Sequence, residues 1–171
     1  MGKNSSFILL ILSLFAFIQG CYKEPSFDTK PEISFKNIDK QIRIDPFTGA
    51  NKDSLIISIS FKDGDGDLGF SETEKDSAEK LSNYNYVVKA FRQQKGKLTE
   101  IKSDIPYSGY FPRLTSDDKK RPIEGVLDYS LDFPHPFTPK KDSVQFQIFV
   151  KDRAGNVSNT VITKMIILNE F

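Results

Sequence analysis

The chain has 171 residues, and its 24 lysine and arginine residues almost balance 23 aspartate and glutamate residues, so the net charge is +1. This balance provides no excess of positive charge for a polyanion, and we expect no nucleic-acid partner. Cys21 is the only cysteine, which excludes an intrachain disulfide.

The first 20 residues have the layout of an export signal. Lys3 precedes an apolar run over residues 7–18, and the small residue Gly20 stands directly before Cys21. A transmembrane helix needs about 20 apolar residues, and this run is shorter. We therefore predict a cleaved signal peptide over residues 1–20.

Residues 18–21 resemble the lipobox of bacterial lipoproteins, in which the cysteine is acylated and becomes the mature N-terminus. The alternative is an ordinary cleavable signal with an incidental cysteine. Acylation explains an unpaired thiol in an exported protein, and several acyl chains anchor stably where one holds only reversibly. We predict lipid attachment at Cys21, a tether over residues 21–30 and a domain over residues 31–171.

Apolar and polar residues alternate with a period of two in three segments, as they do in half-buried strands: 55–61, 127–133 and 144–150. Further candidate strands are 33–36, 41–44, 84–92, 97–101 and 157–168. With turn residues between them, these segments predict an all-β, immunoglobulin-like antiparallel sandwich of about seven to nine strands. Ser71 and Glu74 form an S-x-x-E capping box that predicts one short helix over residues 71–81.

An acidic loop with the sequence DGDGDLG follows the strand at 55–61 directly. Asp63, Asp65 and Asp67 alternate with glycines, and such close carboxylates repel one another unless a cation neutralises them. In an EF-hand register they occupy positions 1, 3 and 5 and Glu74 occupies position 12, although Leu68 replaces the glycine of position 6. The pattern favours a structural calcium site; the alternative is a solvated turn.

A second loop is expected beside the acidic loop. Lys62-Asp63 and Lys151-Asp152 both end a strand, and in an immunoglobulin-like topology the loops that follow lie at the same end of the sandwich. Asp152 is therefore predicted to complete the metal site.

The long connection over residues 103–123 carries Tyr107, Tyr110 and Phe111. These rings could stack on a sugar or dock a partner, or they could cover an open sheet edge. The chain has one histidine, His135, and no motif that pairs a nucleophile with a base, so we expect no enzymatic activity.

The lipobox, the acidic loop, the segment RPIEG at 121–125 and DRAGNVSNTV at 152–161 together resemble small lipoproteins of the Bacteroidota that have no established activity. The resemblance implies a lipid-anchored outer-membrane location, on the periplasmic or cell-surface side. The leading hypothesis is a noncatalytic envelope lipoprotein whose calcium-stiffened sandwich binds or scaffolds partners. One alternative is a glycan-binding surface lipoprotein of a nutrient-uptake system, and another is a hydrolase that uses the metal of the loop.

Overall fold

The structure is a computed structural model that describes residues 25–117 and 119–171. The predicted signal peptide, Cys21 and the first part of the tether lie outside the described residues. None of the described helices is long and apolar enough to cross a membrane.

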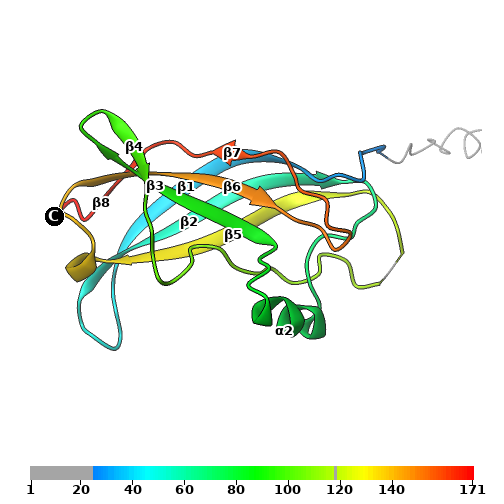
Figure 1. Ribbon diagram of the computed structural model, residues 1–171, viewed down its shortest axis with the longest axis horizontal. Helices are drawn as coiled ribbons and strands as arrows, with labels where there is room; N and C mark the ends of the chain where they lie inside the picture. The colour runs from blue at the N-terminus through cyan, green and yellow to red at the C-terminus, as the bar shows by residue number, and fades with distance from the viewer. Residues whose placement is uncertain (1–24, 118) are drawn as a thin grey trace, which may run out of the picture.

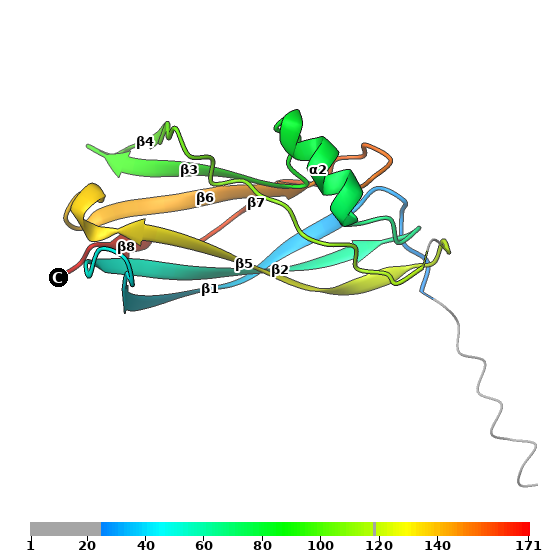
Figure 2. The same ribbon diagram turned by 90° about the horizontal axis from the view of Figure 1, so that it is seen from below.

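The domain is an all-β sandwich of two antiparallel sheets, which Figure 2 shows as two layers with one helix beside them. The first sheet has the order β1-β2-β5, and the second has the order β4-β3-β6-β7 with β8 also beside β6. This order is that of the predicted immunoglobulin-like fold. The strands are β1 (Glu32–Ile44), β2 (Asn51–Asp63), β3 (Tyr86–Gln94), β4 (Lys97–Glu100), β5 (Ile123–Pro134), β6 (Asp142–Val150), β7 (Val161–Ile162) and β8 (Ile166–Leu168).

The central strands β2 and β6 supply most of the core. Every second residue of each strand points between the sheets and is buried, because the side-chain period of a strand is two. All the buried residues of the described hydrophobic core lie between Ile33 and Leu168, so residues 25–171 contain that whole core. The inward residues are Leu55, Ile57, Ile59 and Phe61 of β2 and Val144, Phe146, Ile148 and Val150 of β6.

Two of the expected strand boundaries are wrong. β1 is one 13-residue strand with a register shift between Phe35 and Asn37, where two separate strands were expected. The expected strand over residues 157–168 is broken instead. Its Ser158 and Thr163 hydroxyls accept the backbone N–H groups of Val150 and Phe146, so side chains replace part of the ladder.

The predicted short helix is confirmed as α2 (Glu72–Lys80). Ser71 is its N-cap, with the Glu74 N–H donating to Ser71 Oγ and the Ser71 N–H donating to Glu74 Oε2 at 2.7 Å. A 3₁₀ turn, η1 (His135–Phe137), follows β5 at the other end of the molecule. Figure 1 shows the acidic loop and the start of the described chain at one end, and the C-terminus at the opposite end.

Candidate metal site

The three aspartates of the acidic loop form a cluster at the end of β2. Asp63 is the last residue of the strand and is fully buried, whereas Asp65 and Asp67 are partly buried in the loop. One carboxylate oxygen from each residue lies within 4.8 Å of the others, so the three residues could together hold a metal ion.

Backbone contacts from two other segments hold this loop in place. The Gly64 N–H donates to the carbonyl of Asp28 at 2.8 Å, where the tether enters the domain. Gly69 has a φ of +87°, and a Cβ there would lie 2.1 Å from the carbonyl oxygen of Pro112. Only glycine fits such a backbone approach, so the glycines of the motif position the carboxylates.

Each of the three carboxylates has an oxygen without a hydrogen-bond partner. The Oδ1 atoms of Asp63, Asp65 and Asp67 are all buried, and no group in the part of the chain that the structure describes donates to them. The other Asp63 oxygen accepts the Asp67 N–H at 3.0 Å, and Lys120 Nζ lies 3.3 Å from Asp65 Oδ2. Buried polar atoms are normally paired, so three orphaned oxygens in one cluster fit a missing cation.

The electrostatics of the cluster lead to the same interpretation. Burial, together with the charges of Asp67, Asp65 and Asp152, raises the pKa of Asp63 to about 6. Burial also raises the pKa of Asp67, with Asp152 and Asp65 adding to the effect. The ionised cluster is therefore strained without a counter-ion, and a bound divalent cation would remove that strain.

The structure brings Asp152 and its loop beside the acidic loop, as the topology predicts. Leu68 and Asp152 form a β-bridge, and the Ala154 N–H donates to Asp67 Oδ2 at 3.1 Å. The Asp152 carboxylate, however, accepts the backbone and side-chain N–H groups of Asn156 at 2.7 and 2.8 Å. Asp152 thus adds negative charge next to the cluster but is not one of its three converging carboxylates.

Glu74, the expected last ligand of an EF-hand-type loop, also lies outside the cluster. Its carboxylate accepts the Ser71 N–H and two Arg113 N–H groups, at 2.9 and 3.1 Å, and this pairing lowers its pKa to about 2. Leu68, which replaces the glycine of an EF-hand loop, is completely buried and paired with Asp152. Glu74 is held by Arg113 and by the capping box of α2, and these contacts keep it out of the cluster.

The three aromatic residues of the long connection do not share one exposed surface. Phe111 is buried, Tyr110 packs on Tyr84 with ring centroids 5.1 Å apart, and Tyr107 stacks on Phe133 at 5.6 Å. They belong to a segment that covers part of the β3 edge, where Gly109 exchanges two backbone hydrogen bonds with Tyr86. Of the two roles considered for these rings, this arrangement matches edge covering.

Sequence reasoning missed the side chain that fixes this segment. Asn85 is fully buried, and its amide donates to the Phe111 carbonyl and accepts the Phe111 N–H, both at 3.0 Å. The Asn85 side chain thus makes the two hydrogen bonds to Phe111 that the backbone of a neighbouring strand would otherwise make. No local pattern marks it, because its partner lies 26 residues away.

Comparisons of this chain with protein-family models, with curated proteins and with solved structures give no match. The fold and the site themselves therefore define its class, an immunoglobulin-like β-sandwich with an acidic loop that could hold a metal ion.

Proposed function

We propose that the chain is a noncatalytic lipoprotein of the cell envelope, in which one calcium ion joins the loops at the tethered end of the sandwich. The observation that supports this most directly is the set of three buried Oδ1 atoms in Asp63, Asp65 and Asp67 that lack a donor in the described residues. In this proposal the domain scaffolds partners, and the ion stiffens it.

Calcium is the cation that the donor set suits best. The cluster offers carboxylate oxygens and no histidine or thiol, which favours a hard cation over zinc or copper. Magnesium demands near-ideal octahedral geometry and gives up its water reluctantly. Calcium accepts six to eight oxygens in flexible arrangements, and an irregular loop of aspartates and backbone carbonyls can provide several of them.

The location of the cluster supports a structural role for the ion. The loop contacts the tether through Asp28, the segment before β5 through Lys120, and the loop after β6 through Ala154. An ion at this point would tie these segments together where the domain joins its tether (Figure 1). The three aspartates also lie outside the lining of the nearby cavity beside α2, as a structural ion requires.

The test is a calorimetric calcium titration of the soluble domain, residues 25–171, with Asp65→Asn and Asp152→Asn variants. Asp104→Asn, an exposed aspartate in another loop, is the matched control. We expect saturable binding that Asp65→Asn abolishes and Asp104→Asn leaves intact. Loss in Asp152→Asn as well would add Asp152 to the site. Absence of binding at millimolar calcium would reject the ion.

The lipoprotein part of the proposal rests on the sequence around Cys21 and has its own test. Cells that express the full chain are labelled with palmitate, and the Cys21→Ser variant is labelled in parallel. We expect label in the parent chain only. Equal labelling of both chains, or of neither, would contradict acylation at this cysteine.

The glycan-binding alternative receives less support. Of the three aromatic residues, Tyr107 lines the cleft of about 810 Å³ beside β5, whereas Phe111 is buried in the core and Tyr110 packs on Tyr84. A continuous aromatic platform for a sugar would need the rings to face solvent together.

A further inference from the structure

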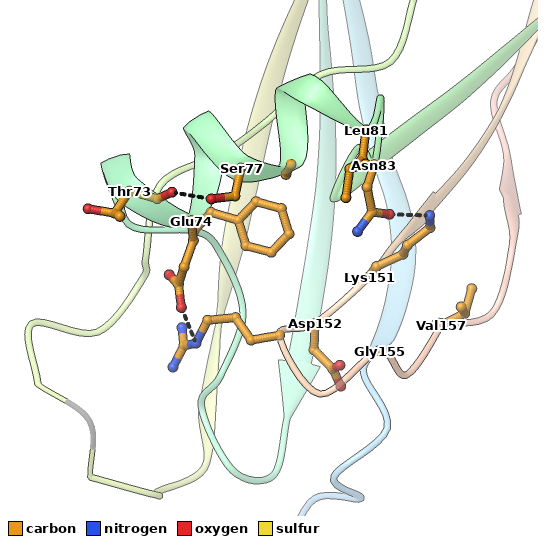
Figure 3. Close-up of a pocket in the computed structure, with 12 residues that line it drawn as sticks. Thr73, Glu74, Ser77, Leu81, Asn83, Lys151, Asp152, Gly155 and Val157 are labelled. Atoms are coloured by element: carbon orange, nitrogen blue, oxygen red, sulfur yellow. Dashed lines mark hydrogen bonds and ion pairs between the residues drawn. The ribbon is translucent and has the colours of Figure 1, made fainter.

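A second candidate site lies beside the acidic loop. A cavity of about 590 Å³ separates α2 from the segment that follows β6. Figure 3 shows Leu81 and Asn83 at the end of the helix on one side, and Lys151 and Val157 on the other. The cavity has an apolar part formed by Phe70, Ala78, Leu81 and Val157. Its size falls within the range of pockets that enclose a small organic molecule.

Both walls are fixed by contacts within the chain. On the helix side, Glu74 is held by two hydrogen bonds from Arg113 and by the capping box. On the other side, Asp152 accepts two hydrogen bonds from Asn156, and Asp67 accepts the Ala154 N–H. A ligand would therefore meet a preformed cavity, which reduces the ordering cost of binding.

The charged side chains that line the cavity differ in the hydrogen-bond and ion-pair partners that they find within the chain. Its two carboxylates, Glu74 and Asp152, both accept several hydrogen bonds. Lys151 Nζ donates to Asn83 Oδ1 at 3.0 Å and has no carboxylate partner among the residues described. Arg153 differs from Lys151, because it donates from Nη1 to the Gly69 carbonyl and its Nε forms an ion pair with Glu74 Oε1 at 3.9 Å.

One cationic group without a carboxylate partner among the described residues, Lys151, thus stands at the edge of the apolar part of the cavity. Arg153 lies at the other end of the helix, where it pairs with Glu74, whereas Lys151 reaches Asn83 beyond the last turn of α2. An anion beside Lys151 would accept a charge-assisted hydrogen bond, and an apolar body attached to it would cover Phe70, Leu81 and Val157.

We propose that this cavity is a binding site for a small organic carboxylate with an apolar body. The carboxylate pairs with Lys151, and the apolar body lies between the helix and Val157. This inference goes beyond the calcium proposal and does not depend on it, because Asp63 and Asp65 do not line the cavity and its walls are held by hydrogen bonds already present.

The test uses octanoate as the probe and its neutral amide, octanamide, as the matched ligand. Both are titrated into the isotope-labelled domain, residues 25–171, and followed in proton–nitrogen correlation spectra. We expect saturable octanoate shifts confined to residues 70–83 and 151–157, with octanamide binding about tenfold more weakly, the loss typical of one charge-assisted contact.

Lys151→Gln removes one charge at nearly constant size, and Lys89→Gln, on exposed β3 surface, is its control. We expect Lys151→Gln to weaken octanoate binding and leave octanamide unchanged, while Lys89→Gln alters neither. The proposal would be overturned by equal affinity for both ligands, by shifts centred on another part of the domain, by no effect of Lys151→Gln, or by the absence of saturable binding. Asp65→Asn keeps octanoate binding if the two sites are independent, so failure of the calcium site and failure of this site are distinguishable.

Discussion

Replacing Asp63 by asparagine should stabilise the metal-free domain at neutral pH. Burial and three neighbouring carboxylates raise the pKa of Asp63 from 3.8 to about 6. Because each tenfold change in acid strength is worth about 1.4 kcal/mol, the ionised form costs the fold roughly 3 kcal/mol above pH 7. Asparagine removes this charge and keeps an oxygen to accept the Asp67 N–H, which now donates to Asp63 Oδ2.

The sign of the pH dependence follows from the direction of the pKa change. Below about pH 3, Asp63 is protonated in both the folded and the unfolded chain and contributes no difference. As the pH rises from 3.8 to about 6, the unfolded chain ionises and the folded chain does not, so the metal-free domain loses stability, and above about 6 the loss is complete. We expect the Asp63→Asn variant to exceed the parent by about 2 to 3 kcal/mol at pH 7.5 and to match it near pH 3.

Urea denaturation with a chelator measures this difference, since urea, unlike guanidinium chloride, does not screen charge. Calcium should reverse the order when it is present at about 1,000 times its dissociation constant, because it then adds about 4.1 kcal/mol to the parent and nothing to a variant that cannot bind it. If the metal-free variant were less stable than the parent at pH 7.5, the account of a strained carboxylate cluster would be wrong.

Three further substitutions test separate parts of the structure. Glu74→Gln should lower stability by about 1 kcal/mol at neutral pH. This loss should vanish as the pH falls from 4.5 towards 2, because pairing with Arg113 lowers the pKa of Glu74. Calorimetry should show that the calcium affinity of this variant is unchanged. A large loss of calcium affinity would instead identify Glu74 as a ligand. Asn85→Ala should cost about 2 to 4 kcal/mol in urea denaturation, because it leaves the Phe111 N–H and C=O without their partner. Tyr86→Phe should not lower the unfolding free energy, because the buried Tyr86 hydroxyl has no partner in the described residues; a loss above about 1 kcal/mol would reveal one.

The sheets and the position of the acidic loop could be predicted from the sequence because both depend on local pattern and topology. A period of two over Leu55 to Phe61 specifies a strand with one buried face, and the strand that ends at Val150 has the same pattern. The Ser71 capping box specifies where α2 begins. The proximity of Asp152 to the acidic loop then follows from the strand order alone.

The ligand set of the loop could not be predicted in full, because the role of each carboxylate depends on the hydrogen-bond partners that it finds in the folded chain. Arg113, 39 residues away, holds Glu74, and Asn156 holds Asp152. A motif register counts residues along the chain and cannot show which side chains are already paired. Lipid attachment at Cys21 remains a prediction from the sequence.

Asp67 connects the two proposed sites, and this makes a sharper comparison possible than either titration alone. Its Oδ1 is one of the three buried oxygens without a donor in the described residues, while its Oδ2 accepts the Ala154 N–H and so holds the loop that carries Arg153. Asp65 has no such contact with that loop among the described residues, and its carboxylate accepts a hydrogen bond from Lys120 instead. Asp65→Ala should therefore abolish calcium binding and keep octanoate binding.

Asp67→Ala should abolish calcium binding and also weaken octanoate binding. Asp67→Asn should abolish calcium binding and keep octanoate binding, because its amide oxygen can still accept the Ala154 N–H. Calcium calorimetry and octanoate spectra on the three variants give this comparison. If Asp67→Ala and Asp67→Asn bound octanoate equally, the Ala154 contact would not hold the wall of the cavity. The acidic loop would then be a metal site only, with no part in shaping the surface beside it.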